Sequence, residues 1–145
     1  MSSGGKNSHL RVALVILATC CTAVPASRAQ TGARPADAGS IARGKQSFRD
    51  HCAVCHGNDA HGNGPAAAAL TPRPTDLSLF TKRTGSFPAA KVEASIRGTD
   101  PVVAHGIPGM MVWGAILRSE ANGNEARTDE QIADLVAFIR SIQAK

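Results

Sequence analysis

Two cysteines and a histidine lie within five residues of one another, followed by a glycine, as Cys52-Ala53-Val54-Cys55-His56-Gly57. Residues three and four positions apart share one face of a helix, so Cys52, Cys55 and His56 can converge on a single object. The spacing C-x-x-C-H is the attachment signal of a c-type haem. The two thiols would form thioethers with the haem vinyl groups, and His56 would ligate the iron. A chain with this motif has to fold around a covalently held macrocycle.

Two other uses of such a motif are less consistent with the sequence. A structural zinc site normally has four protein ligands, with a second pair at recognisable spacing. The remaining cysteines, Cys20 and Cys21, are adjacent and lie in a predicted leader segment. A thioredoxin-like redox pair follows a strand in a βαβ unit, whereas a helical pattern precedes this motif. We therefore predict one covalently bound haem c.

The first 29 residues have the three parts of a secretory signal peptide. Lys6 and Arg11 precede an apolar run over residues 12–24, and small residues follow up to Ala29. The run has 13 residues, fewer than the roughly 17 that span a bilayer. We predict cleavage after Ala29, with cleavage after Ala26 as the second choice, and a periplasmic protein without a membrane span. A retained membrane anchor and lipid attachment at Cys20 are the alternatives.

Removal of the leader changes the charge and the size of the chain. It leaves 116 of 145 residues, enough for one small domain, and lowers the basic residues from 16 to 13 against 11 acidic ones. The net charge of +2 that results does not support nucleic-acid binding. Four Phe, one Trp and no Tyr cannot build a large aromatic core, so an apolar cofactor would complete it.

The mature chain is predicted to begin with a flexible lead-in over residues 30–39, followed by a single mono-haem domain over residues 40–145. Ser40 is the predicted N-cap of a first helix that carries Ile41, Gly44 and Phe48 on the same side as the motif cysteines. Gly44 is costly in a helix interior, which suggests the close approach of another helix.

Residues 57–84 are rich in Gly and Pro and are predicted to be loop, with one helical turn over residues 66–70. A loop of this length needs a surface to pack on, and the haem face would provide it. A ligating histidine usually donates its second ring proton to a carbonyl or a carboxylate. We predict that the Pro65 carbonyl accepts this proton from His56.

Two short helices are predicted next. Ser86 is the expected N-cap of the first, which carries Val92 and Ile96 and ends at Gly98. One or two helical turns are expected over residues 113–118. The polar residues 119–127 are expected to be mobile.

The last helix has the clearest pattern in the chain. Thr128 and Gln131 form a predicted capping box at its start. An apolar stripe follows at three- and four-residue spacing, made of Ile132, Leu135, Val136, Ile139 and Ile142. Its expected partner is the first helix, at Gly44 and Phe48. Because no alternating strand pattern of useful length occurs, the predicted fold class is all-α.

A haem iron held by His56 needs a ligand on its opposite side. The candidates are Met110, Met111, His61 and His105. The two consecutive methionines lie in a Pro/Gly-rich segment with no helical stripe to explain them as core residues. The three histidines His51, His61 and His105 are expected to be exposed residues of loops or helix ends.

The chain resembles the class I cytochrome c family over essentially the whole mature domain. The first helix would end in the haem motif, as Gly44-x-x-x-Phe48-x-x-x-Cys52-Ala53-Val54-Cys55-His56-Gly57. Met110-Met111-Val112-Trp113-Gly114 is similar to the Met-Pro-x-aromatic-Gly segment of small bacterial members. The resemblance implies the small cytochrome c fold, with Met110 as axial ligand and Trp113 at the haem site. Met111 stands where the family has proline, which leaves it as the alternative ligand.

His/Met ligation fills both axial positions, which favours outer-sphere electron transfer over catalysis. We therefore expect a soluble periplasmic carrier that docks briefly on redox protein partners, an electron donor and an acceptor. The alternatives are a fixed haem subunit of a periplasmic dehydrogenase or oxidase complex and, less favoured, a haem enzyme in which Met110 is displaceable. The sequence shows no paired acid and base and no triad for substrate chemistry.

Overall fold

The computed structural model describes Met1 and residues 36–99 and 112–145. The chain divides into one unit over residues 1–31 and another over residues 32–145, and the fold below is that of the second unit. Several predictions lie outside the described residues: the signal peptide, both cleavage sites, His105, Met110 and Met111.

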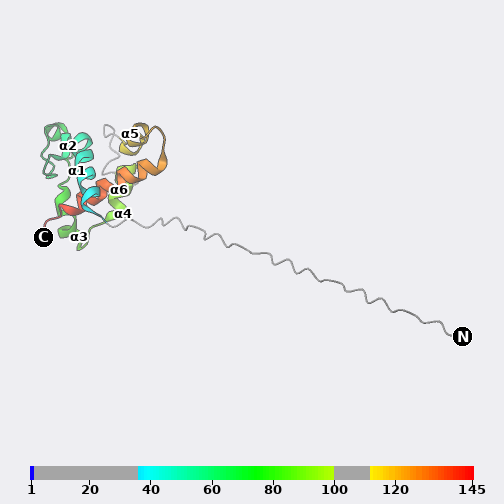
Figure 1. Cartoon of the computed structure of the whole chain (residues 1–145). Coiled ribbons are helices and arrows are strands. Elements are labelled where there is room, and N and C mark those ends of the chain that lie inside the picture. Colours follow the sequence, from blue (N-terminus) through cyan, green and yellow to red (C-terminus); the bar gives the residue numbers. More distant parts are fainter. Residues whose placement is uncertain (2–35, 100–111) are drawn as a thin grey trace. The chain divides into compact units, whose positions relative to one another are not determined.

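The regular elements of the second unit, over its described residues, are helices joined by loops (Figure 1). Its elements are α1 (Ala38–His51), α2 (Ala53–His56), the 3-10 turns η1 (Ala67–Ala69) and η2 (Leu77–Leu79), α3 (Phe80–Thr84), α4 (Ala89–Arg97), α5 (Trp113–Glu120) and α6 (Glu125–Ser141). No strand occurs over residues 36–99 and 112–145. The all-α fold class is thereby confirmed.

Helix α1 begins three residues before the predicted start. Asp37 is its N-cap: the carboxylate accepts a hydrogen bond from Ser40 N at 2.7 Å, and Ser40 Oγ lies 3.1 Å from Asp37 N, from which it accepts. The prediction that Ser40 is the N-cap was therefore wrong. Ser40 instead occupies the third helical position of a reciprocal capping box, in which an acid and a hydroxyl have exchanged their usual places.

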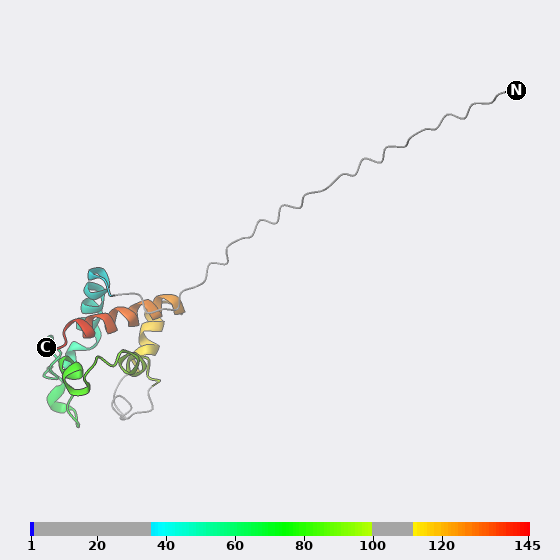
Figure 2. The same cartoon turned by 90° about the horizontal axis from the view of Figure 1, so that it is seen from below.

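Helices α1 and α6 pack closely against each other, as predicted, and Figure 2 shows α6 passing alongside α1 in a second view. A Cβ atom on Gly44 would lie 1.9 Å from the carbonyl oxygen of Asp134 and 3.0 Å from Cβ of Phe138. Only glycine permits this approach of the two backbones. One turn further along α1, the Phe48 ring meets the Phe138 ring with centroids 5.2 Å apart.

A charged pair lies beside the Gly44 contact. Arg43 Nε donates to Asp134 Oδ2 at 2.6 Å, and Arg43 Nη2 donates to Asp134 Oδ1 at 3.0 Å. The Asp134 side chain is 8% exposed, whereas that of Arg43 is 50% exposed. Because the guanidinium binds both carboxylate oxygens, it fixes the register of α6 along α1 and also the distance between the two helices.

The apolar stripe of α6 faces the core, as predicted. Ile132, Leu135 and Ile139 are buried, and Val136 and Ile142 are partly buried against them. The other main core side chains come from α1, α4 and α5: Phe48, Val92 and Leu117. The core is therefore formed where α6 meets three other helices.

The N-terminal end of α6 differs from the prediction. Asn124 is the N-cap and accepts from Arg127 N at 3.1 Å, while Thr128 lies inside the helix. Thr128 is 2% exposed and its hydroxyl donates to the Asn124 carbonyl at 3.0 Å. Residues 119–127, expected to be mobile, contain the end of α5, a turn and the first turn of α6.

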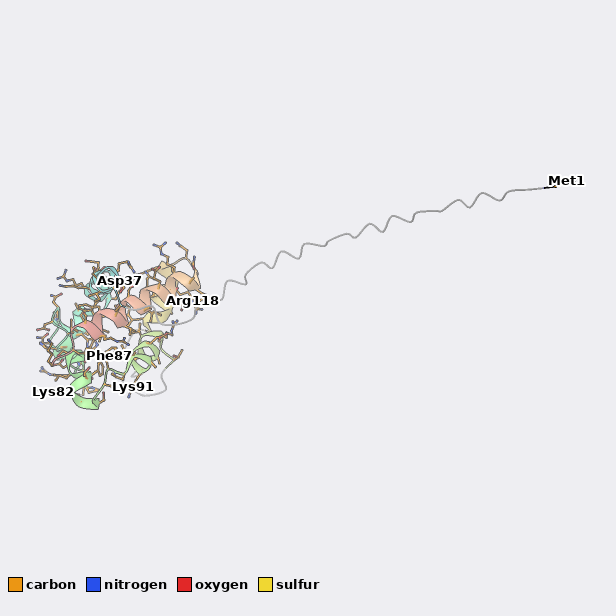
Figure 3. The ribbon with its side chains drawn as sticks, turned by 60° about the horizontal axis from the view of Figure 1, so that its bottom comes forward. Met1, Asp37, Lys82, Phe87, Lys91 and Arg118 are labelled. Atoms are coloured by element: carbon orange, nitrogen blue, oxygen red, sulfur yellow. The ribbon has the colours of Figure 1, made fainter. Side chains whose placement is uncertain are left out.

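The long loop also contains more helix than predicted. The turn expected over residues 66–70 is present as η1, but η2 and α3 were missed. Helix α4 has Pro88 rather than Ser86 at its N-cap, and it ends at Gly98, with φ of +77°, as expected. Figure 3 labels Phe87 close to Lys82 and Lys91 in that view. Arg140 of α6 stacks over the Phe87 ring, 5.2 Å from its centroid.

The α1–α6 contact makes a testable prediction for Gly44→Ala. Alanine is the better helix former by about 1 kcal/mol. The new methyl group would nevertheless overlap the backbone of α6, and overpacking of this kind costs about 1–3 kcal/mol. We therefore expect a net loss of stability in urea unfolding.

Gly39→Ala in the same helix is the matched control. Its new methyl group would approach only the side chains of Asp37 and Arg43, at 3.2 and 3.5 Å. This variant should unfold close to the wild-type midpoint. A Gly44→Ala protein as stable as Gly39→Ala would contradict the close contact.

Candidate haem site

The cysteine–histidine motif lies where α1 ends and the single turn α2 begins. Cys52 is the C-cap of α1, and its N–H still donates to the Phe48 carbonyl at 2.8 Å. The Cys52 carbonyl then accepts from Cys55 N and His56 N, at 3.1 and 2.9 Å. Both cysteines are free thiols of intermediate exposure, and His56 is 8% exposed. The motif is thus helical, as its spacing predicts, and the side chains that could hold a haem share one short turn.

The segment after the motif folds back over α2. Gly62 N donates to the His56 carbonyl at 2.8 Å, Gly64 N to the Cys55 carbonyl at 3.1 Å, and Ala66 N to the Val54 carbonyl at 2.9 Å. The last carbonyls of a helix have no hydrogen-bond donor within that helix. Here the loop that folds back supplies an N–H donor for each of these three carbonyls. The loop that we expected to need support therefore packs first on the backbone of the motif.

Glycine is required at two positions of this fold-back. Gly62 has φ of +77°, and a Cβ on it would lie 2.2 Å from the Pro74 carbonyl oxygen. A Cβ on Gly64 would lie 2.5 Å from the carbonyl oxygens of both Ala53 and Val54. Any larger residue would push the loop away from the motif.

The ring of His56 is oriented by the loop. Its Nδ1 lies 3.0 Å from the carbonyl oxygen of Thr75. Because a carbonyl can only accept, Nδ1 carries the proton, and Nε2 is the nitrogen with a lone pair for a metal. The carbonyl at Nδ1 is therefore that of Thr75, and our assignment of Pro65 was wrong. Pro65 is exposed and precedes η1.

The surroundings of Cys52 favour an uncharged sulfur atom. Burial, and secondarily the nearby Cys55, raise the pKa of the Cys52 thiol to about 12. A thiolate nucleophile or a redox-active cysteine instead has its pKa lowered by nearby positive charge. A thioether carries no charge, so the buried position of Cys52 suits covalent attachment of a haem.

Trp113 lies beside the motif, at the first position of α5. Its ring meets that of His51, the residue before Cys52, with centroids 5.3 Å apart. His51 Nε2 also lies 3.4 Å from a carboxylate oxygen of Glu120, at the other end of α5. The His51 side chain is 19% exposed, so it is not the exposed helix-end histidine that we expected. It joins α5 to the start of the motif.

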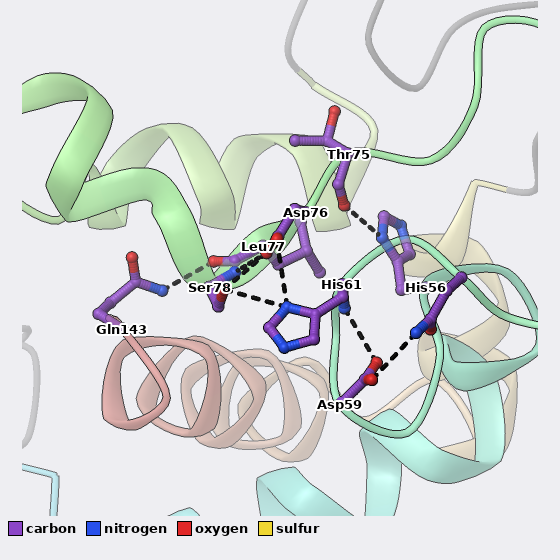
Figure 4. Close-up of polar contacts among 9 residues, drawn as sticks. His56, Asp59, His61, Thr75, Asp76, Leu77, Ser78 and Gln143 are labelled. Atoms are coloured by element: carbon purple, nitrogen blue, oxygen red, sulfur yellow. Dashed lines mark hydrogen bonds and ion pairs between the residues drawn. The ribbon is translucent and has the colours of Figure 1, made fainter. Parts of the chain in front are cut away.

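His61, one of the candidate axial ligands, has its Nδ1 nitrogen directed at two polar side chains of the loop. Its Nδ1 lies 3.1 Å from Asp76 Oδ2 and 3.3 Å from Ser78 Oγ (Figure 4). Its side chain is 51% exposed, in agreement with the expectation of an exposed loop histidine. Among residues 36–99 and 112–145, no three His, Cys, Asp or Glu side chains gather as a metal site.

Sequence reasoning did not find Thr75. Any carbonyl of a Gly/Pro-rich loop can accept a proton, so the spacing from His56 cannot select one. A signal for the segment was nevertheless present, because Asp76 precedes the apolar run Leu77-Ser78-Leu79-Phe80. An acid in that place predicts a helix start. In the structure Asp76 is the N-cap of η2, and its carboxylate accepts from Ser78 N at 2.9 Å.

The sequence matches the family model of cytochrome c over residues 41–143. The chain therefore belongs to the cytochrome c family, in which haem c is bound covalently and transfers electrons between redox partners. Searches of the curated proteins and of the solved structures find no significant match. None of the helices in the described part of the chain is long and apolar enough to cross a membrane.

Asp76 makes the stability of the site dependent on pH. Burial alone would raise the pKa of its carboxyl group, but hydrogen bonds from Ser78 and His61 outweigh burial and hold the pKa below its usual value. A depressed native pKa contributes stability that is present above the unfolded pKa, about 3.9, and is lost as the pH falls through the native value.

We therefore expect Asp76→Asn to be less stable than the wild type at about pH 5 and above, and the difference to shrink below about pH 4. Urea unfolding of both proteins at about pH 6 and pH 3 measures this difference in stability. Because the other titrating groups are common to both proteins, the difference reports Asp76. An equal difference at the two pH values would contradict the assignment.

Proposed function

We propose that Cys52 and Cys55 hold one haem c through two thioethers and that His56 is the proximal ligand of its iron. The observation that carries this proposal is the state of the His56 ring. It is buried at the end of the motif turn, and its Nδ1–H is directed at the Thr75 carbonyl, so the lone pair that a metal would use is on Nε2. A second hydrogen bond of this kind is the usual way in which a ligating histidine is oriented.

The second axial ligand in this proposal is Met110, with Met111 as the alternative. The family resemblance supports Met110, since Trp113 and Gly114 follow it in the expected register. In addition, Trp113 packs against His51, which places the first residue of α5 beside the motif. A segment that ends at Trp113 therefore has its C-terminal end close to the proposed site.

The function that follows is outer-sphere electron transfer by a six-coordinate His/Met haem. The bound haem supplies an iron atom that alternates between its ferrous and ferric forms. The chain would contribute the rest: Cys52 and Cys55 would fix the position of the cofactor, His56 and Met110 would ligate its iron, and packing of the domain around the haem would limit access of water. Limited access of water disfavours the additional charge of the ferric form and so raises the reduction potential.

We further propose that residues 1–29 are a signal peptide and that the mature domain is a soluble periplasmic carrier. A cleaved leader delivers the chain to the compartment in which haem c is attached. Brief docking on a donor and an acceptor suits such a carrier, since the complex has to dissociate after each electron.

Mass spectrometry of the exported protein tests the attachment and the leader together. We expect a chain that starts at Gln30 and carries the mass of one haem. Cys52→Ala and Cys55→Ala should each lose one thioether and incorporate less haem. Cys20→Ser, which changes a cysteine of the leader, should leave the mature mass unchanged. A mature wild-type chain without the mass of one haem would refute the proposal.

Absorption spectroscopy of the ferric protein tests the second ligand. Sulfur ligation of ferric haem gives a weak long-wavelength absorption band in this family. We expect the wild type to show this band, Met110→Ala to lose it and Met111→Ala to keep it. The two variants remove the same side chain from neighbouring positions, so each is the control for the other. The opposite pattern would assign the ligand to Met111, and a wild type without the band would rule out both.

A further inference from the structure

The Thr75 carbonyl lies in a segment that has little structure of its own. Thr75 is exposed, and the only regular element nearby is the three-residue turn η2. A carbonyl can nevertheless orient a ligating ring only if it is held in place. The structure contains a set of contacts that hold it, and Figure 4 shows them around His56 and Thr75.

The first group of contacts comes from the loop that follows the motif. The Asp76 carboxylate accepts from Ser78 Oγ at 2.6 Å and lies 3.1 Å from His61 Nδ1. Since the Ser78 hydroxyl proton is directed at Asp76, Ser78 Oγ can accept from the same His61 N–H at 3.3 Å. His61 thus bridges the two polar side chains that surround Leu77.

A backbone hydrogen bond joins the same two segments, residues 59–61 and 76–78. Leu77 N donates to the Ala60 carbonyl at 2.8 Å, and Ala60 is fully buried, with φ of +64°. Asp59 Oδ1 accepts from His61 N at 3.1 Å. The residues that follow Thr75 are therefore fixed to the loop that folds back over His56.

The second group of contacts comes from the end of α6. Gln143 Nε2 donates to the carbonyls of Leu77 and Ile139, both at 2.8 Å, and Gln143 Oε1 accepts from Thr81 N at 2.9 Å. Ala144 N donates to the Ser78 carbonyl at 2.8 Å. One amide side chain thus uses both of its ends to fasten η2 and α3 to the helix that forms the core.

We propose that His61, Asp76, Ser78 and Gln143 are positioning residues for the haem ligand, and we call these four side chains the Thr75 bracket. They hold the Thr75 carbonyl at His56 Nδ1 from two sides, the motif loop and α6. They act on the ring through the Thr75 carbonyl. This inference rests on the proposed function, in which His56 ligates the iron.

The bracket acts on the chemistry of His56 through its hydrogen bond. A carbonyl held at Nδ1–H makes the imidazole a stronger electron donor, which stabilises the ferric form and lowers the reduction potential. If the bracket is loosened, Thr75 moves away from the ring for a larger fraction of the time. Two measurable quantities then change together: the Nδ1 proton exchanges faster with solvent, and the reduction potential rises.

The experiment uses the haem-loaded wild type and four variants: His61→Gln, Asp76→Ala, Ser78→Ala and Gln143→Ala. Proton exchange at His56 Nδ1 is followed by NMR of the nitrogen-labelled ferrous protein, and the potential by redox titration. We expect roughly fivefold to tenfold faster exchange in Asp76→Ala and Gln143→Ala, the effect of losing about one net hydrogen bond, together with a higher potential. Asp76→Asn, which keeps a side-chain oxygen for Ser78 N, should lie between Asp76→Ala and the wild type.

Two controls remove similar groups elsewhere. Asp129→Asn removes the charge of the carboxylate that accepts from Arg97 Nη1 at 2.8 Å, and Gln46→Ala removes a glutamine that binds Asp50 within α1. Neither contacts the bracket. Both should leave the exchange rate and the potential at the wild-type values, even if they lower the unfolding midpoint.

The proposal is overturned if the bracket variants bind haem but match the controls in exchange rate and potential, whatever their stability. If Asp76→Ala fails to fold, the His61→Gln variant tests the proposal in its place. The His61 side chain is half exposed, so this substitution should disturb the fold little. Unchanged exchange in that variant would also overturn the proposal. A wild type without covalent haem would instead refute the proposed function, so the two failures are distinguishable.

Discussion

The crossing of α1 over α6 at Gly44 determines where the motif can lie. Because the α6 backbone at Asp134 occupies the space of the missing side chain, the two helices are as close as backbones allow. The Phe48–Phe138 contact and the Arg43–Asp134 pair then follow on either side of Gly44. Cys52 is one turn beyond Phe48 along the same helix. A chain without the close approach would have neither its core nor a fixed end of α1 from which the motif could start.

The loop after the motif shows how an irregular segment becomes well defined. Its contacts are made largely by backbone groups: the N–H groups of Gly62, Gly64 and Ala66 cover three carbonyls of the motif turn. Glycine permits this because its backbone can approach another backbone directly. The Thr75 carbonyl then completes the arrangement at His56. The side chains of the loop are used mainly to fasten one part of the loop to another.

Much of this arrangement could be predicted from the sequence, and the limits have physical reasons. The spacing of Gly44, Phe48 and the α6 stripe predicted the helix pair, because burial of an apolar face follows a fixed period. The helix starts were wrong by several residues at Ser40 and Thr128, since both lie within a turn of a better N-cap, Asp37 and Asn124. The predicted hydrogen-bond partner of His56, the Pro65 carbonyl, was wrong because every residue has a carbonyl and the sequence does not show which one lies at the ring. Sequence patterns identify side-chain chemistry, whereas this contact depends on the course of the backbone.

The Arg43–Asp134 pair joins residues that are 91 positions apart in the chain. Closing a loop of that length costs about 4 kcal/mol of chain entropy on the simplest polymer estimate, before any other ordering. The core is incomplete until this closure is made, because α6 contributes four of the ten buried side chains of the core cluster, more than any other element. Folding should accordingly depend on an encounter between distant parts of the chain and be slower than in helical proteins with local contacts. By the same reasoning, separation of α6 from α1 would expose the side chains that pack on α6 from several elements at once, so we expect the domain to unfold as one cooperative unit.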